Sequence, residues 1–383
     1  MSNVQDDTVA LARQLIACRS VTPADGGCLD LIAARLSTAG FRCEHMDRGG
    51  VRNLWARHGQ GAPLVCLAGH VDVVPPGPVE AWTSDPFVAT DRDGFLYGRG
   101  ASDMKGPLAA LVTAAVRVVA AHPDHAGSIA LLLTSDEEGA AIDGTVTVVE
   151  ALHARGETID ACIVGEPTSM ARLGDTVKHG RRGSLSGTLV VKGIQCHIAY
   201  PERGRNPIHE ALPALDELVS VEWDRGNEHF PPTGLQISNV HAGSGTVNVI
   251  PGSLDVLFNI RFSPGSTDAG IKARVQAVLD RHGLEYDLIW GSSAAPFMTE
   301  PGRLVEILSR TIADVTALTP ELSTSGGTSD GRFIARIARE VVEFGPVAEA
   351  MHGVDERVRI ADLGPLSVIY ERTVERLLAV DKS

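Results

Sequence analysis

Three short runs of almost uninterrupted apolar residues constrain the fold of this chain more than any other feature of its sequence. They are LVCLAGHVDVV at 64–74, SIALLLTSD at 128–136 and DACIVGE at 160–166. Helical patterns lie before and between them, at 8–18, 107–121 and 145–154. Near-continuous apolar strands that alternate with helices are typical of parallel strands buried on both faces. We therefore predict an α/β fold whose mostly parallel sheet carries helices on both faces.

The pattern changes near GRRGS at 180–184. From there the elements run strand, helix, strand, strand, helix, strand, which is the order of a ferredoxin-like split βαβ unit. The small-residue stretch GSSAAP at 291–296 follows and is typical of a hinge. Helix and strand patterns like those of the first half then return. We predict that 1–181 and 296–383 form one α/β domain, and that 182–295 form an α+β domain inserted into it.

The acidic charge balance excludes several classes of partner. The 34 Lys and Arg residues against 48 Asp and Glu residues give a net charge of −14, and aromatic residues make up 4% of the chain. Nucleic acids and anionic membranes are bound by clustered basic residues, and single-stranded bases stack on aromatic platforms. We expect neither a nucleic acid nor a membrane surface as a partner.

The cysteines and the N-terminus bear on the cellular compartment. Six scattered cysteines without a C-x-x-C pair predict neither a zinc ribbon nor a dense disulfide framework. The N-terminus lacks a basic segment followed by an apolar one, and the most apolar stretch, 107–122, is interrupted by Arg117. We expect no membrane span. Reduced thiols in a cytoplasmic protein are the simplest interpretation.

His70 and Asp72 stand two residues apart in the first apolar run. Alternate residues of an extended strand share a face, so the imidazole and the carboxylate can meet at the end of the strand. A carboxylate behind an imidazole fixes its tautomer and strengthens it as a metal ligand. A core histidine with a satisfied partner is the competing interpretation, and for an isolated H-x-D it is the better one.

Asp103 lies in the glycine-rich segment GRGASDMKG at 98–106. A phosphate-binding loop is the obvious alternative, but the order G-x-x-x-x-G-K-[ST] is absent because Lys105 precedes Gly106. A carboxylate on a glycine-shaped loop before a helix suits a metal ion better.

Acidic residues also follow the other two apolar runs. Glu137 and Glu138 come after the second run, behind Asp136, and Glu166 comes at the end of the third. A charged run is usually a solvated loop, but active residues of parallel sheets lie just past the carboxyl ends of strands. Together with His352 on a later loop, these residues make a set of two imidazoles and several carboxylates. One bridging carboxylate, with one His and one Glu per ion, would hold two divalent ions, for which zinc, cobalt or manganese suits these donors better than calcium.

These motifs closely resemble those of the dinuclear zinc amidohydrolases and peptidases of the M20 family. The metal motifs that carry the resemblance are HVD (70–72), GRGASDMKG (98–106), DEEG (136–139), GEPT (165–168) and HGVDE (352–356). Later motifs extend it over the rest of the chain, at KGIQCH (192–197), NVIPG (248–252), NIRF (259–262), SGGTSDGRF (325–333) and EFGP (343–346). The later motifs point, within the family, to the enzymes that remove succinate from N-succinyl-LL-2,6-diaminopimelate.

The resemblance implies a role for each motif residue. It implies that Asp103 bridges two Zn²⁺ ions, for which Co²⁺ is a possible substitute. It implies that His70 and Glu166 complete one coordination set, that Glu138 and His352 complete the other, and that the Asp103–Met104 peptide is cis. In the implied mechanism Asp72 supports His70, Glu137 is the general acid/base beside a hydroxide that bridges the metals, and the inserted domain is a dimerisation and lid domain. From there, His197 would reach the site of the partner subunit in a homodimer and stabilise the oxyanion.

The implied substrate is a small anionic N-acyl amino acid, and basic residues stand out in so acidic a chain. Arg offers a carboxylate two parallel hydrogen bonds, which makes it the natural partner for a substrate of this kind. We expect the substrate carboxylates to be bound by Arg181, Ser184, Asn248, Arg261 and Thr328.

Three alternatives remain open at this point. One is an acetylornithine deacetylase-like or aminoacylase-like enzyme of the same family. Another is a metal-binding protein that has lost catalysis, although the presence of Glu137 beside Glu138 speaks against it. The third is a nucleotide-binding loop at 98–106, which predicts that nucleotides protect the protein against heat.

Overall fold

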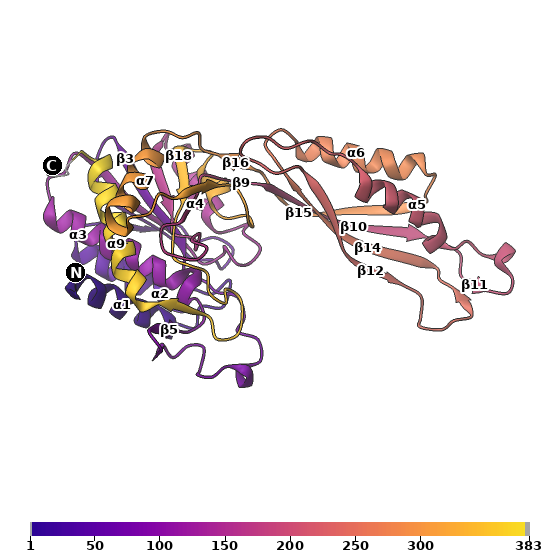
Figure 1. Cartoon of the computed structure of the whole chain (residues 1–383), viewed down its shortest axis with the longest axis horizontal. Helices are drawn as coiled ribbons and strands as arrows, with labels where there is room; N and C mark the ends of the chain where they lie inside the picture. Colours follow the sequence, from indigo (N-terminus) through magenta and orange to yellow (C-terminus); the bar gives the residue numbers. More distant parts are fainter. Residues whose placement is uncertain (1, 380–383) are drawn as a thin grey trace. The chain divides into compact units, whose positions relative to one another are not determined.

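A computed structural model describes residues 2–379 and divides the chain into two compact units (Figure 1). The first unit, called the α/β unit below, comprises the chain up to Gly180, Met298–Ser323 and the chain from Ser329 on. The second, called the α+β unit, comprises Arg181–Phe297 and also Thr324–Thr328, a short segment far beyond it in the sequence.

An eight-stranded sheet forms the centre of the α/β unit, and its inner strands are parallel. β6, β3, β7 and β18 lie side by side in that order with parallel neighbours, while β1 and β2 join the β6 edge in antiparallel fashion. The predicted mostly parallel sheet is therefore confirmed. In sheet order the strands are β1 (Arg42–His45), β2 (Asn53–Gln60), β6 (Gly127–Thr134), β3 (Leu64–His70), β7 (Ile159–Val164), β18 (Ala338–Glu343), β8 (Thr176–Lys178) and β17 (Glu321–Ser323).

Helices cover both faces of this sheet, as the apolar runs predict. One face packs on the main hydrophobic core, which includes side chains from α1 (Ser2–Ala17), α2 (Cys28–Thr38), α3 (Gly106–Ala121), α7 (Arg303–Thr316) and α9 (Ile360–Leu377). The other face carries α4 (Thr145–Ala154) and the short α8 (Gly331–Ile334). A separate three-stranded sheet contains β4 (Thr90–Arg92), β5 (Phe95–Tyr97) and β19 (Arg357–Arg359).

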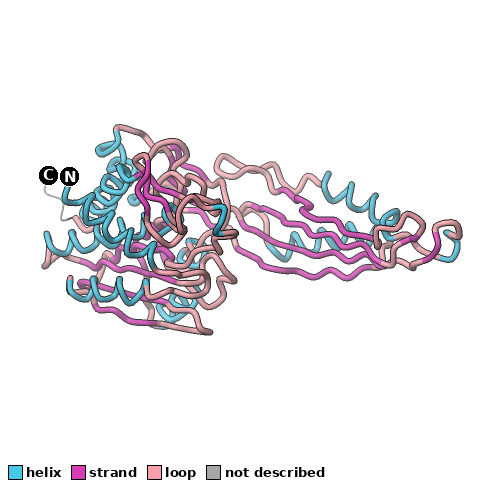
Figure 2. Tube along the Cα trace, turned by 90° about the horizontal axis from the view of Figure 1, so that it is seen from below, coloured by secondary structure: helices cyan, strands magenta, loops and turns pink. Residues whose placement is uncertain are grey.

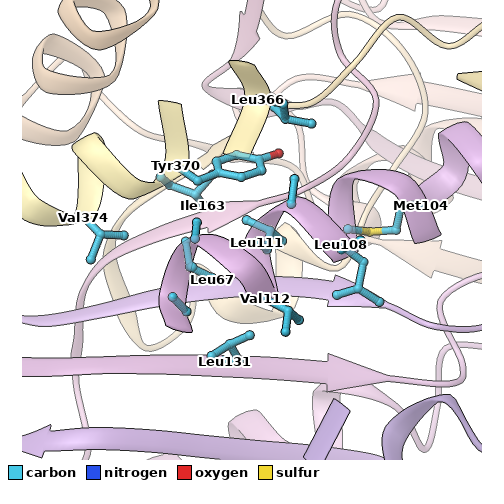
Figure 3. Close-up of a cluster of buried hydrophobic side chains, with 14 of the residues drawn as sticks. Leu67, Met104, Leu108, Leu111, Val112, Leu131, Ile163, Leu366, Tyr370 and Val374 are labelled. Carbon is cyan, nitrogen blue, oxygen red and sulfur yellow. The ribbon is translucent and has the colours of Figure 1, made fainter. Parts of the chain in front are cut away.

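α3 is the central helix of this core. Its apolar side chains lie between the sheet and α9, as the packing of Leu108, Leu111 and Tyr370 shows (Figure 3). Among the described residues, Ala101–Ala121 is the one helical stretch long and apolar enough to cross a membrane by length and composition, and 78% of its apolar window is buried within the fold. Its apolar character is thus accounted for by packing, since each fully buried Leu or Val contributes about 1.5–3 kcal/mol.

The α+β unit has the predicted ferredoxin-like order. Its four strands form an antiparallel sheet in the order β12, β14, β10, β15, and α5 and α6 pack on this sheet through one apolar core (Figure 2). A two-stranded ribbon of β11 and β13 follows the end of β10. The bounds are β10 (Gly183–Lys192), β11 (Cys196–His197), α5 (Pro207–Ser220), β12 (Gly234–Ala242), β13 (Val249–Ile250), β14 (Ser253–Phe262), α6 (Asp268–Arg281) and β15 (Tyr286–Ala294).

The structure adds to one expectation and corrects another. In the stretch 291–296, which the sequence favours as a hinge, the first four residues belong to β15, and Ser293 and Ala294 pair with β10. The first apolar run was expected to be a strand over 64–74, but β3 ends at His70. The second difference matters for the site, because Asp72 lies beyond the strand.

Candidate metal centre

Five predicted ligands come together at one edge of the eight-stranded sheet. His70 is the last residue of β3, Glu138 follows β6, and Glu166 follows β7 by two residues. Since β6, β3 and β7 are parallel neighbours, their carboxyl ends lie at the same edge. Asp103 lies on η2 (Ala101–Lys105), an irregular turn before α3, and His352 lies on a turn between β18 and β19.

The five side chains form two groups that share Asp103. One group is His70, Asp103 and Glu166, and in each group the ligand atoms lie within 4.8 Å of one another. The His70 Nε2 atom is 3.2 Å from Asp103 Oδ1 and 3.7 Å from Glu166 Oε1.

The other group is Asp103, Glu138 and His352. The His352 Nε2 atom is 2.9 Å from Glu138 Oε1 and 3.4 Å from the second Asp103 oxygen, Oδ2. Each Asp103 oxygen therefore faces a different imidazole, which is the arrangement a bridging carboxylate needs.

The pKa shifts of these side chains show that the cluster favours positive charge. Hydrogen bonds to Asp103 and then Glu138 raise the pKa of His352 to about 10. Burial opposes a charge on His70, but hydrogen bonds with Asp103 and Asp72 outweigh it and raise the pKa of this imidazole well above its usual value. Burial likewise opposes the charge on Asp103, yet the two imidazoles lower its pKa. Cations are therefore what this cluster stabilises.

Asp72 supports the site in a way that the sequence did not predict. The His70 Nδ1 atom lies 2.9 Å from the backbone oxygen of Asp72 and 3.6 Å from its carboxylate, so the nearer partner of the ring is the backbone. The carboxylate instead accepts the backbone N–H groups of Glu137 (3.3 Å) and Glu138 (3.1 Å). Asp72, which is fully buried, thereby holds the backbone of both glutamates close to the end of β3.

The three consecutive acids have separate functions in the fold. The Asp136 carboxylate is 3% exposed and accepts the N–H groups of Ile142 and Asp143, so it closes the following loop. The chain bends at 137–139, which is the turn that two glutamates serving one site require. Burial, and after it the negative charge of Glu166, raises the pKa of Glu137 well above its usual value.

The loop at 98–106 is not a phosphate cradle. Its N–H groups at Gly100, Ser102 and Asp103 are all donated to the carboxylate of Glu356. Gly100 has a φ of 83°, and a Cβ there would lie 2.6 Å from Val73, so this turn requires glycine. The peptide between Asp103 and Met104 is cis, as the family resemblance implied.

Met104 is a supporting residue that the sequence reasoning missed. Its sulfur accepts the N–H of His70 at 3.3 Å. A Cβ at Gly69 or at Gly165 would lie 2.3 or 2.7 Å from its methyl carbon, so both glycines leave room for this side chain. Met104 therefore packs against the chain beside His70 and beside Glu166, and the signal for it was the glycine before each ligand.

The remaining predicted residues lie in the α+β unit, where they fall into two sets. Ser184 and Arg261 are paired across β10 and β14, at the end where β10 begins. Near the other end, beyond Lys192, His197 pairs with Val249, and Asn248 accepts the N–H of Ile198. The predicted substrate residues of this unit are therefore not brought to one place. Arg181 and Thr328 also belong to this unit, and Arg181 donates a hydrogen bond to the Ser325 carbonyl.

The donor set of the two groups fits divalent transition-metal ions. Each group offers one imidazole and two carboxylates, one of them shared, which are donors that zinc and cobalt accept. The residues present therefore fit two metal ions that share Asp103.

Comparisons with known proteins place the chain in one family. The model of peptidase family M20/M25/M40 matches residues 66–376. The succinyl-diaminopimelate desuccinylase of Azoarcus sp. strain BH72 is 62% identical over 378 residues, which cover 99% of this chain and 100% of that protein. The enzyme of the same name from Bordetella bronchiseptica is 60% identical and covers 97% of this chain and 98% of its own.

Solved structures show the same fold at low sequence identity. An M20 family metallo-carboxypeptidase from Sulfolobus solfataricus has a TM-score of 0.84 at 16% identity, and the match covers 98% of this chain and 100% of that one. Bacillus subtilis YXEP, a dinuclear metal-binding peptidase of the M20 family, has a TM-score of 0.73 at 15% identity, covering 99% of each chain.

Proposed function

The chain belongs to peptidase family M20/M25/M40, and from this premise we propose that it is a metal-dependent hydrolase of N-succinyl-LL-2,6-diaminopimelate. Its products are succinate and LL-2,6-diaminopimelate, an intermediate of lysine biosynthesis. The observation that carries this substrate is the identity of 60–62%, over 97–99% of the chain, to succinyl-diaminopimelate desuccinylases. An acetylornithine deacetylase-like or aminoacylase-like activity is the alternative within the family.

We propose two Zn²⁺ ions per subunit, with Co²⁺ as a substitute. His70 and Glu166 would hold one ion, Glu138 and His352 the other, and Asp103 both. Ions bound there would polarise the amide carbonyl and lower the pKa of water towards about 7. Mixed imidazole and carboxylate donors support zinc or cobalt over calcium.

Glu137 is the proposed general acid/base. It takes a proton from the attacking water and later delivers one to the leaving amine, a contribution typically worth about 10²–10⁴-fold in rate. The upward shift of its pKa, caused by burial and by Glu166, is in the direction that suits proton transfer near neutral pH. Asp72 orients this residue, because its carboxylate accepts the Glu137 N–H.

His197 is the proposed donor to the developing oxyanion. Its Nδ1 atom accepts the N–H of Ala199 at 3.1 Å, so in the neutral ring the proton is on Nε2. The ring is exposed, and its Nε2–H is thus free to donate to a substrate oxygen. An oxyanion donor of this kind is typically worth about 3 kcal/mol.

We propose that the enzyme is a homodimer in which His197 acts on the partner's substrate. The support comes from within the α+β unit. Ser184 and Arg261 lie at one end of β10, and His197 and Asn248 lie beyond the other end. Ten strand residues span about 33 Å at about 3.3 Å per residue, so one small substrate does not reach both sets in one chain. In the proposed dimer, each active site would take Ser184 and Arg261 from one subunit and His197 and Asn248 from the other.

We also propose a cytoplasmic location. All six cysteines lie within the described residues and are free thiols, and two of them, Cys66 and Cys162, are buried neighbours on adjacent strands. Unpaired cysteines in such number fit a reducing compartment.

The proposal is tested by assaying metal-loaded protein on N-succinyl-LL-2,6-diaminopimelate and on N-acetylornithine. We expect release of succinate to be strongly preferred, and Glu137→Gln to lower kcat by about 10²–10⁴-fold while two metal ions remain bound. Preferred turnover of N-acetylornithine would overturn the substrate. An unchanged rate in Glu137→Gln would overturn the role of Glu137.

A further inference from the structure

Glu356 is a buried acid that the proposed mechanism does not use. It lies directly before β19 and is 1% exposed. Its carboxylate accepts five hydrogen bonds from the segment that carries Asp103. Oε2 accepts Arg99 Nη1 at 2.8 Å and Gly100 N at 2.9 Å, and Oε1 accepts Ser102 N, Ser102 Oγ and Asp103 N at 3.0 Å each.

Arg99 extends these contacts to the segment that carries His352. This guanidinium is 1% exposed, lies over the Trp82 ring at 5.0 Å and donates its second nitrogen, Nη2, to the His352 carbonyl at 3.4 Å. The turn it reaches is an unusual one, because Ala350, His352 and Asp355 all have φ values of 56–59° without being glycine. Left-handed backbone of this kind persists only where surrounding contacts hold it.

The Glu356 site is suited to a carboxylate. Each oxygen accepts at least two hydrogen bonds, so an amide in its place would set its NH₂ group against N–H groups or against Arg99. The Arg99–Glu356 pair is also withdrawn from water, where removing one charge leaves the other buried and unpaired. These contacts join positions more than 250 residues apart in the sequence.

We propose that Glu356 and Arg99 form a clamp that sets the position of Asp103 relative to His352. Both are positioning residues. The His70 group depends on the clamp through Asp103 alone, since His70 ends β3 and Glu166 follows β7. The His352 group depends on it through two of its three ligands. The clamp therefore controls the second metal ion more than the first, an inference that rests on the proposed metal site.

The test is a calorimetric titration of Zn²⁺ into metal-free protein, wild type and Glu356→Gln. We expect the wild type to bind two ions. We expect the ion of the His70 group to be the tighter, because its ligands His70 and Glu166 are held by β3 and β7. In Glu356→Gln this ion should stay within about threefold of its original affinity. The weaker ion, that of the His352 group, should lose about 10–100-fold, which is the usual cost of losing a partner that orients a ligand. Excess Zn²⁺ should then restore kcat, because a positioning residue takes no part in the chemistry.

A matched control is Glu349→Gln, an acid three residues before His352 whose carboxylate pairs with Arg357 and Arg359. We expect both of its affinities to be unchanged. Circular dichroism of the metal-free variants confirms that they fold. Should Glu356→Gln fail to fold, Ser102→Ala removes one of the five hydrogen bonds, and we expect it to weaken the second ion by at least threefold.

If Glu356→Gln folds and binds both ions with unchanged affinity, the clamp is overturned. If Glu356→Gln does not fold, unchanged affinities in Ser102→Ala overturn it. An equal loss of affinity for both ions would overturn the inference that the clamp acts mainly on the His352 group. Because the titration contains no substrate, a wild type that binds two ions but does not release succinate refutes the proposed substrate and leaves the clamp standing.

Discussion

The two halves of the metal centre are built differently although they share Asp103. His70 is 1% exposed at the end of a central strand, its Nδ1 lies against the Asp72 carbonyl, and Met104 packs beside it. The His352 side chain is 47% exposed and stands on a turn with left-handed backbone. One half is therefore fixed by the sheet and its core, and the other by a few hydrogen bonds to a loop. We infer that the first half is preorganised for its ion and that the second is the adjustable one.

Removal of the shared ligand should have the largest effect, because it affects both halves at once. We expect Asp103→Asn to bind neither Zn²⁺ tightly and to lose at least about 10³-fold in kcat/KM, since the two proposed ions would supply both the electrophile and the nucleophile of the reaction. Metal content by mass spectrometry after gel filtration, with kcat/KM on the succinylated substrate, checks this. Full occupancy in this variant would mean that Asp103 is not shared.

The difference between the two halves predicts that replacing each histidine removes a different metal ion. We expect His70→Gln to lose the tighter ion and His352→Gln to keep it while losing the weaker one. Zn²⁺ titrations of both metal-free variants measure this directly. A tighter ion that disappears in His352→Gln but survives in His70→Gln would reverse the order of the two halves.

A smaller effect concerns the pH dependence of the metal-free protein. The pKa of His352 is raised to about 10 by Asp103 and Glu138, against about 6.5 in an unfolded chain. The stabilisation this imidazolium gives is complete below about pH 6.5 and is lost as the pH rises through about 10. We expect urea unfolding to show a fall in stability over this interval that is smaller in His352→Gln. Identical pH profiles for the two proteins would contradict the contact.

The same difference explains what was predictable from the sequence. His70 lies within the first apolar run, Glu138 follows the second and Glu166 ends the third. Parallel strands bring their carboxyl ends to one edge, so the local pattern was enough to place these residues near one another. Asp103 was proposed from its glycine-shaped loop before a helix and His352 from the donor set that the other residues left incomplete, and the resemblance of their motifs then gave each its role.

The supporting contacts were not predictable, for physical reasons. The bonds from Glu356 to the Asp103 segment and from Arg99 to His352 join distant parts of the chain through a conformation that no local pattern encodes. Asp72 was predicted to serve His70 with its carboxylate because the strand was expected to continue. The strand ends at His70, so the carboxylate of Asp72 lies 3.6 Å from the His70 ring and also accepts the N–H groups of Glu137 and Glu138.

The most direct test of the account is anomalous diffraction at the zinc edge from crystals of metal-loaded protein. We predict two zinc peaks in each subunit, one bound by His70 and Glu166 and the other by Glu138 and His352, with an oxygen of Asp103 about 2 Å from each. A single peak at full zinc saturation, or two peaks of which one does not touch Asp103, would contradict the account.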